Sequence, residues 1–285
     1  MASSEHRLHA GGPHGVRPLG WWRKSRVSRW AANAAWFVLP LLLGALVWQA
    51  LAETTAAPSV PSLSNIAEAW VTLLGRGEIL TSVAHSLTNA LIAMALAIVA
   101  GLAVGTAMAR SATIGAALRP YVDMLMSAPL AVLVPVFVVL FRDPTQVIVA
   151  TAFVYCLFPI LENTRLGIVT VSPDLVSMAR SFGVSRPRLV LRVLFPSALP
   201  MILTGLRISV SKSFKGVLLG EILITVAGLG GRLHYYGSGF RTDFVYALTA
   251  TTVVLALLLV AVARGLELWL LRRFPQGSTE VILEA

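Results

Sequence analysis

Long apolar runs with few charged residues constrain this chain more than any other feature of its sequence. They lie at about 31–52, 86–109, 119–141, 145–163, 197–226 and 244–271. An α-helix needs roughly 20 apolar residues to cross a bilayer, so the runs predict six membrane-spanning helices and an all-α integral membrane protein. Of the 285 residues 56% are hydrophobic and only 13% are charged, which excludes an ordinary soluble enzyme.

Basic residues are unevenly distributed among the segments that connect these runs. Sixteen of the 23 Lys and Arg residues lie in the first 30 residues, between spans two and three, between spans four and five, or at the carboxyl end, whereas Arg76, Arg142, Arg232 and Arg241 lie on the opposite side. Positive residues near span ends are retained in the cytoplasm, so both termini are predicted to be cytoplasmic. This topology explains the net charge of +10 better than nucleic-acid binding does, since no basic run interleaved with aromatics forms an exposed site.

The same runs predict the domain organisation. A basic tail at 1–30 precedes a six-span domain at 31–275, and a short cytoplasmic tail follows at 276–285. We expect the run at 31–52 to be a retained span, because a cleaved signal peptide has a shorter apolar core. The segment between the first two spans contains one amphipathic stretch at 66–74 and is too small for a receptor domain.

Small residues recur at every fourth position of the second run, where they form the stripe Ala93, Ala97, Gly101, Gly105 and Ala109. Such a stripe lets another helix approach closely, and close packing holds helices together in lipid. The stripe therefore predicts either packing within the chain or a face for a second copy.

The third run contains Pro129 and Pro135. Proline lacks a backbone N–H group and bends a helix. The two prolines therefore predict a bent span, and bent spans often border a transport pathway.

The segment 172–196, between spans four and five, carries the most specific pattern. Leu175, Met178, Ala179 and Phe182 follow a spacing of i, i+3, i+4 and i+7, which predicts a short helix with one apolar face that ends at Gly183. A second helix is expected to begin near Pro187, since proline is favoured in the first helical turn. The first helix either lies on lipid headgroups, anchored by neighbouring arginines, or fits a socket in a cytoplasmic partner.

The spacing of this segment resembles the signature loop of ABC-importer permeases. That signature is Glu-Ala-Ala, three residues, Gly, nine residues, Ile, one residue and Leu-Pro. The chain has Ser177-Met178-Ala179, Gly183, Val193, Phe195 and Pro196 at these places. The glycine, the proline and their separation match, whereas Ser177 and Met178 stand where the family has an acid and an alanine.

The resemblance covers most of residues 58–275 and is closest to the nitrate/sulfonate/taurine-type permeases. It implies a type I ABC-importer permease fold, with a cytoplasmic coupling helix between spans four and five and multi-pass insertion in a prokaryotic inner membrane. Residues that match the family's ATPase-coupling segment are Asp174, Ser177, Met178, Ala179, Arg180, Phe182, Gly183, Ser185 and Arg186.

The resemblance also implies partners. A second permease copy or a paralogue would complete the pathway, two cytoplasmic ATPases would dock on the coupling loops, and an extracytoplasmic solute-binding protein would deliver the cargo. ATP and Mg would bind to the ATPase and not to this chain, because its lysines, Lys24, Lys212 and Lys215, are not preceded by the glycine that a phosphate-binding loop requires.

Lys212 and Lys215 lie three residues apart in the fifth run. A charge at bilayer depth costs about 2.5–3.5 kcal/mol on insertion scales, so each lysine needs a cavity or a partner. The lysines either pair with Glu221 or reach the interface, or they line a pathway for an anionic organic solute or oxyanion. With Glu221, Pro129 and Pro135 they form the candidate pathway set, while the identity of the solute stays open.

Two other classes of membrane protein are alternatives. An ion-coupled secondary transporter or channel would use Lys212, Lys215, Glu221 and Asp123 as a charge relay, but it predicts inverted repeats, which the sequence does not display. A membrane enzyme would need catalytic side chains that converge on one site, and the sequence does not display such a set. We therefore expect a transport subunit and not an enzyme.

Overall fold

The computed structural model describes residues 39–40, 42–54, 59–224 and 227–273, and the regular elements within these ranges are all helical. Residues up to Ser62 form one unit and residues from Leu63 form another. In the first unit, Leu42–Thr54 is an apolar helix, and the indole N–H of Trp48 donates a hydrogen bond of 3.0 Å to the carbonyl of Pro61. The predicted tails 1–30 and 276–285, and part of the first predicted span, lie outside the described residues.

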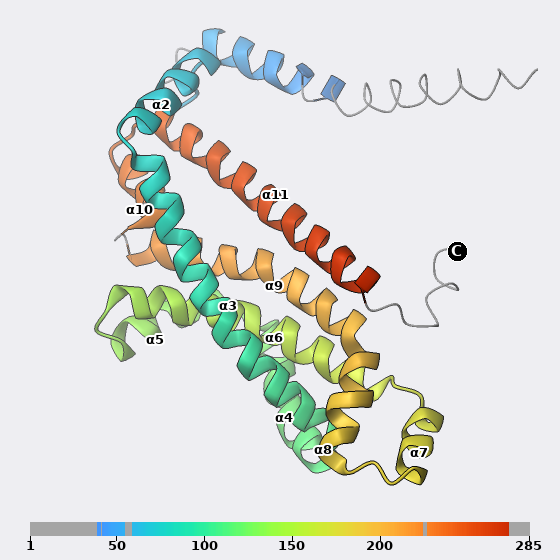
Figure 1. Cartoon of the computed structure of the whole chain (residues 1–285). Helices are drawn as coiled ribbons and strands as arrows, with labels where there is room; N and C mark the ends of the chain where they lie inside the picture. Colours follow the sequence, from blue (N-terminus) through green and yellow to red (C-terminus); the bar gives the residue numbers. More distant parts are fainter. Residues whose placement is uncertain (1–38, 41, 55–58, 225–226, 274–285) are drawn as a thin grey trace, which may run out of the picture. The chain divides into compact units, whose positions relative to one another are not determined.

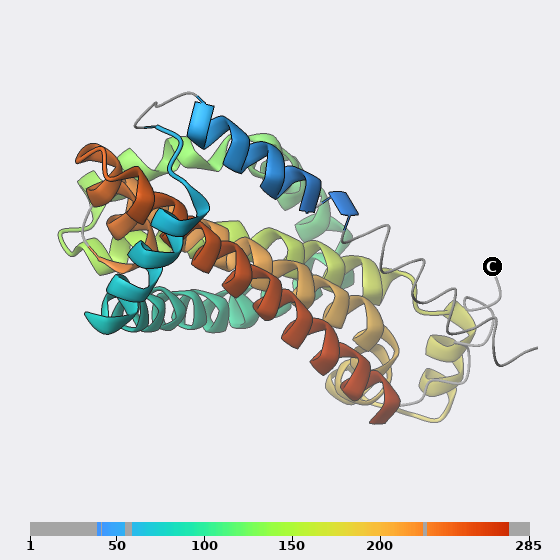
Figure 2. The same ribbon diagram turned by 90° about the horizontal axis from the view of Figure 1, so that it is seen from above.

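The second unit is built around three long helices, α3 (Glu78–Arg110), α6 (Pro144–Val169) and α9 (Phe195–Ile224). Helix α6 packs against both α3 and α9 (Figure 1, Figure 2). At a rise of about 1.5 Å per residue, each of these helices is long enough to cross a bilayer.

The small residues of α3 pack against α6. Ala93 and Ala97 are completely buried. A Cβ added to Gly101 would lie 2.8 Å from Ile160, and one added to Gly105 would lie 2.6 Å from the carbonyl oxygen of Leu161. The stripe therefore mediates close helix packing within the chain, which is the first of the two interpretations of the sequence.

Helix α9 approaches α6 through glycines in the same way. A Cβ at Gly216 would lie 2.7 Å from the Cα of Ala152, and one at Gly205 would lie 2.7 Å from the Cβ of Asn163. Helix α6 is thus enclosed from two sides. In its most apolar stretch 44% of the residues are buried, compared with 11% in that of α11 (Thr242–Arg273).

Helix α11 lies along α9 and is anchored at both ends. Near its start it contacts α2 (Leu63–Gly75) and α10 (Gly228–Ser238), and the indole of Trp70 donates to the hydroxyl of Thr251 at 3.1 Å. Towards its end, Arg207 of α9 forms an ion pair of 2.9 Å with Glu267, and the hydroxyl of Thr204 donates to the same carboxylate at 3.2 Å. Opposite charges within two adjacent spans are thereby paired.

The third predicted span, 119–141, is not one continuous helix. It consists of α4 (Ala112–Ser127), the short helix η1 (Leu130–Val132) and α5 (Leu133–Leu140), with a bend of 91° at the break. Ala128 is extended, with ψ 144°, because the ring of a following proline disfavours the helical conformation. The bend expected at Pro129 is confirmed, whereas α5 continues through Pro135 and the expectation of a bend there is wrong.

Four described helices are long and apolar enough to span a membrane, and the bent pair makes up to five. The other predicted spans, 86–109, 145–163, 197–226 and 244–271, correspond to α3, α6, α9 and α11, although their boundaries shift by up to eight residues. The count of six stays a prediction, because the first span falls partly outside the described residues.

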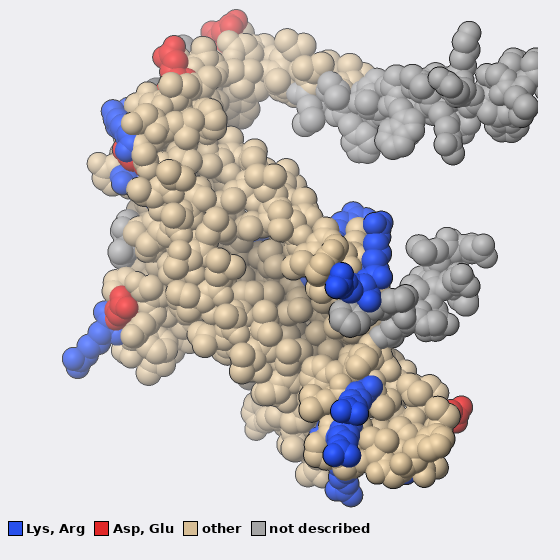
Figure 3. Space-filling model, viewed as in Figure 1, with Lys and Arg blue, Asp and Glu red and all other residues tan. Residues whose placement is uncertain are grey.

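Charged side chains are unevenly distributed along the second unit. In Figure 3, Lys and Arg side chains gather over α7 (Pro173–Ser181) and α8 (Arg186–Leu189) and near the end of α11, while the middle of this face carries almost none. An uncharged middle between charged ends is typical of a membrane protein.

Candidate coupling segment and polar sites

The coupling segment forms the predicted helix-turn-helix. Helix α7 begins after Ser172 with Pro173 in its first turn and ends before Gly183, which has a left-handed φ of 73°. The N–H of Gly183 donates to the carbonyl of Arg180 at 2.9 Å, and the N–H of Val184 donates to that of Ala179 at 3.2 Å. This double hydrogen bond is a Schellman cap, which favours glycine.

The second helix of the segment, α8, begins at Arg186 with Pro187 in its first turn. It continues through the π-turn η2 (Val190–Leu194) into α9. The coupling segment is therefore connected directly to a membrane-spanning helix. No loop separates α8 from that span.

Helix α7 has two different faces. Leu175, Met178 and Phe182 are exposed by 37%, 56% and 81% and form the outer face, as the apolar spacing predicts; Ala179, the fourth residue of the pattern, is half-buried. On the other side, Val176 packs on the cluster that contains Ile168, Val190 and Leu194. One face thus anchors the helix to the spans and the other leaves large apolar side chains free to contact a partner.

The remaining predicted coupling residues lie on the same exposed segment. The hydroxyl of Ser177 donates to the carbonyls of Pro173 and Asp174, both at 3.0 Å, so the residue that replaces the family's acid is satisfied within its own helix. Asp174 lies in the first turn of α7 and Arg180 in the last. Ser185 precedes α8, and Arg186 is its first residue.

The candidate pathway residues are not brought together as one set. Lys212 and Lys215 are exposed on α9, and neither pairs with an acid in the part of the chain that the structure describes. Pro129 immediately precedes η1 and Pro135 lies in α5; both of these helices contact α6. Glu221 is completely buried, so pairing of the lysines with Glu221, one of the alternatives open from the sequence, does not occur.

Glu221 instead joins three helices through a polar cluster. The hydroxyl of Ser86 on α3 lies 2.9 Å from both carboxylate oxygens, the N–H of Gly230 on α10 donates at 2.9 Å, and Nδ1 of His85 lies at 3.3 Å. The N–H of Leu229 donates to the Ser86 hydroxyl at 3.0 Å. A buried carboxylate requires such partners.

The glycines around this cluster leave space for the carboxylate. Gly228 has a φ of 81°, and a Cβ added there would overlap the carboxylate of Glu221; a Cβ at Gly230 would lie 2.7 Å from the Cβ of Glu221. The sequence shows an acid in an apolar run and a Gly-Leu-Gly motif nearby. Neither signal identifies Ser86 or His85 as partners, because they lie more than 130 positions away.

A second polar cluster lies at the opposite end of the unit from α7 (Figure 1). Glu78 at the start of α3 accepts a hydrogen bond of 2.8 Å from the hydroxyl of Tyr236 and forms an ion pair of 3.2 Å with Arg232. Burial, and secondly the hydrogen bond to Glu78, raise the pKa of Tyr236. This cluster fixes α10 to α3.

The polar groups give no support to the alternative classes. Asp123, which a charge relay would use, pairs with Arg119 on its own helix at 3.5 Å. Glu221 is buried, whereas Lys212 and Lys215 are exposed. No group of three metal-ligating side chains occurs among the described residues.

Comparison with known proteins assigns the chain to a family. Residues 97–275 match the family of binding-protein-dependent transport system inner membrane components. The nitrate import permease NrtB of Leptolyngbya laminosa is 28% identical over 73% of this chain and 77% of its own length. The bicarbonate transport permease CmpB of Synechococcus elongatus is 29% identical over 88% and 95%, and the taurine transport permease TauC of Escherichia coli is 29% identical over 65% and 67%.

Solved structures share the fold. A chain of the MetNI methionine ABC transporter in inward-facing conformations superposes with a TM-score of 0.61 at 18% identity, over 70% of this chain and 97% of that one. A chain of an amino acid ABC transporter gives 0.58 at 19% identity, over 69% and 96%. The chain therefore belongs to the binding-protein-dependent inner membrane permeases: it is the membrane-spanning transport subunit of an ABC importer, whose ATP is hydrolysed by a separate subunit.

Proposed function

We propose that two copies of this chain form the pathway of an importer for a small anion. Two cytoplasmic ATPases that bind ATP and Mg dock on the outer faces of α7, and an extracytoplasmic binding protein delivers the cargo. The chain's termini and α7 then lie on the cytoplasmic side. The observation that carries the anionic cargo is the pair Lys212 and Lys215, exposed on a membrane-spanning helix without an acidic partner among the described residues.

The lysines support a pathway because their charge is unfavourable against lipid. Lys212 and Lys215 share the exposed side of α9 with Ile208, which is 40% exposed. A charged residue within a span faces a water-filled cavity or another protein surface. In an assembly of two copies, this stripe meets the lumen between them, where two ammonium groups from each copy attract an anion.

The cargo class is supported by the relatives. Their names assign nitrate, bicarbonate and taurine to them, and each of these solutes carries a nitrate, carboxylate-like or sulfonate oxyanion. Glu221 and Pro135 are not part of the pathway that we propose, since Glu221 has structural partners and Pro135 lies within α5.

Uptake into proteoliposomes tests the proposal. The chain is purified with its ATPase, supplied with its binding protein, and assayed with radiolabelled nitrate, bicarbonate and taurine with and without ATP. Exchanging both lysines for alanine should reduce ATP-driven uptake at least about ten-fold, because each lysine loses roughly one charged contact with the anion. Exchanging both for arginine should preserve most of the uptake. Wild-type uptake by the alanine variant would overturn the role of the lysines, and uptake independent of ATP would overturn the importer.

A further inference from the structure

A pocket lies between the inner face of the coupling segment and the ends of two spans. It has a volume of about 1140 Å3 and is lined by α7, the turn after it, α8 and the last residues of α3 and α6. It lies on the side of α7 opposite to Phe182, which does not line it. The pocket is therefore separate from the outer face assigned above to the ATPase.

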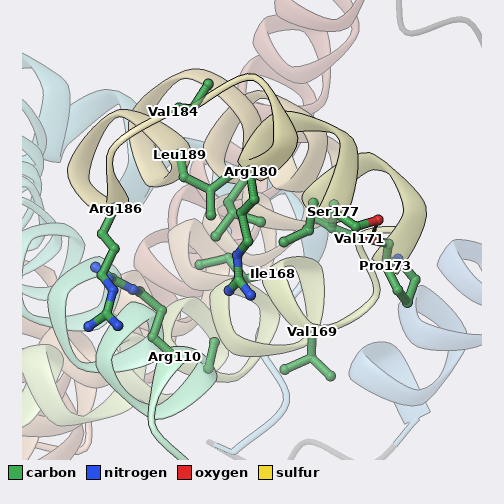
Figure 4. Close-up of a pocket in the computed structure, with 14 residues that line it drawn as sticks. Arg110, Ile168, Val169, Val171, Pro173, Ser177, Arg180, Val184, Arg186 and Leu189 are labelled. Carbon is green, nitrogen blue, oxygen red and sulfur yellow. Dashed lines mark hydrogen bonds between the residues drawn. The ribbon is translucent and has the colours of Figure 1, made fainter.

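Three arginines from three helices reach into this pocket. Arg110 ends α3, Arg180 lies in the last turn of α7, and Arg186 begins α8; Figure 4 shows their side chains among the lining residues. No acidic residue lines the pocket, and none of the three arginines forms an ion pair with a residue in the described ranges. Three positive charges around one space, with no counter-charge from the described chain, favour an anion.

The rest of the lining is aliphatic. Ile168, Val171, Val176 and Leu189 form much of it. Arg110 and Val169 mark the ends of two membrane-spanning helices, so the pocket lies at the level where a bilayer presents its phosphate groups. Basic pockets between spans on the cytoplasmic side bind anionic lipid headgroups, and guanidinium groups bind phosphate oxygens in pairs.

We propose that this pocket binds a phosphate-type oxyanion, carried by an anionic phospholipid or free in the cytoplasm. The oxyanion connects Arg180 on the coupling helix to Arg110 and Arg186, and so links α7 to the ends of α3 and α8. Occupancy stabilises the position of α7 against the spans. The coupling segment is thereby sensitive to the anion at its inner face as well as to the ATPase at its outer face.

Binding to the purified permease–ATPase complex tests the site. Phosphatidylglycerol is titrated into complexes in detergent and counted by native mass spectrometry, with phosphatidylcholine as the neutral competitor. Radiolabelled inorganic phosphate is measured by equilibrium dialysis of the complex in phosphatidylcholine nanodiscs at constant ionic strength. Loss of phosphatidylglycerol binding alone in the pocket variant identifies the lipid, and loss of phosphate binding identifies the free oxyanion.

The pocket variant is Arg110→Gln/Arg186→Gln, and the matched control is Arg188→Gln/Arg192→Gln, which removes two charges from the same segment outside the pocket. At about five-fold per arginine, the pocket variant should bind about 25-fold more weakly, and the control should bind as the wild type does. Equal losses in both variants, or no binding by the wild type, would overturn the proposal.

A measurement on the wild type keeps the test independent of variant folding. Phenylglyoxal modifies accessible arginines, and mass spectrometry of peptides reports the rate at each one. Phosphatidylglycerol or phosphate should slow modification of Arg110, Arg180 and Arg186 but not of Arg188. If the ATPase slowed modification of these arginines and neither anion changed the rate, the proposal would be overturned, and a carboxylate of the ATPase would be the partner of the arginines.

Discussion

The hydroxyl of Ser86 lies 2.9 Å from both carboxylate oxygens of Glu221 although 135 positions separate the two residues. The same hydroxyl accepts a hydrogen bond from the N–H of Leu229. One small side chain therefore joins α3 and α9 to the start of α10. Because the cluster is buried, a polar group that loses its hydrogen-bond partner there cannot bond to water instead, and its desolvation free energy is no longer offset.

We expect Ser86→Ala to lower the free energy of unfolding by about 1–3 kcal/mol, because it leaves the buried N–H of Leu229 without its partner and removes the hydroxyl from the Glu221 carboxylate. Thermal unfolding in detergent, followed by size-exclusion of the heated sample, measures the change. Thr88→Ala is the control: Thr88 is exposed and its hydroxyl bonds only its own helix, at the carbonyl of Ala84. Equal stability of Ser86→Ala and Thr88→Ala would show that the cluster contributes nothing.

The contact between α3 and α6 predicts a cost for adding a single methyl group. Gly105→Ala should destabilise the protein by about 1–3 kcal/mol, since the new Cβ would meet a backbone carbonyl, which cannot rotate away. Gly265→Ala in α11, where nothing lies within 4 Å of the added atom, should leave stability unchanged or raise it. Both variants are compared by melting temperature, and a Gly105→Ala protein as stable as Gly265→Ala contradicts the close packing.

The exposed apolar face of α7 predicts loss of coupling without loss of folding. Phe182→Asp should insert and fold normally because its side chain is 81% exposed, yet it should fail to retain the ATPase during purification. Phe240→Asp is the matched control, since Phe240 is 86% exposed and lies beyond α10. Retention of the ATPase by both variants, with normal uptake, would refute the docking role of α7.

Gly183 offers a separate test of the turn between α7 and α8. A Cβ at this position has free space, but the φ of 73° is strained for any other residue. Gly183→Ala should therefore cost about 1–2 kcal/mol and reduce ATP-driven uptake more than it reduces the amount of folded protein. Gly75→Ala, at a position with open space and no left-handed φ, controls for the added methyl group. The prediction fails if both variants transport alike.

The raised pKa of Tyr236 predicts a pH dependence. Burial favours the neutral phenol in the folded protein, so its contribution to stability is complete below the ordinary pKa of 10.0 and is lost as the pH rises through the higher folded value. Tyr236→Phe should be less stable than wild type by about 1 kcal/mol at neutral pH, and this difference should shrink above pH 10. Tyr235→Phe, 62% exposed, should show no such trend in melting temperature.

Most of the fold follows from local pattern. Apolar runs locate four long helices to within a few residues at most ends, and the helix, glycine and proline of the coupling segment lie where their spacing predicts. The third span shows the limit of this approach. Hydropathy treats 119–141 as one run, whereas the conformation of Ala128 before Pro129 divides it.

The candidate site divides in the same way. The outer face of α7 follows from the periodicity of Leu175, Met178 and Phe182, whereas the pocket behind it combines Arg110, Arg180 and Arg186, whose separation in the sequence gives no sign of a shared space. Pairing of Lys212 with Glu221, nine residues later, was one alternative open from the sequence. On an α-helix that separation turns the two residues to different faces, and only packing determines which face is buried.

Hydropathy, charge distribution and turn chemistry are properties of neighbouring residues, so the sequence by itself determined the membrane environment, four of the long spans and the helix-turn-helix of the coupling segment. Only the tertiary structure decided that the small-residue stripe of α3 packs on α6, that Glu221 bonds Ser86, and that Arg207 pairs with Glu267. The physical reason is that pairing between helices depends on their relative rotation and on depth along their axes. Those quantities are set by the shapes of many side chains together and by no single pattern along the chain.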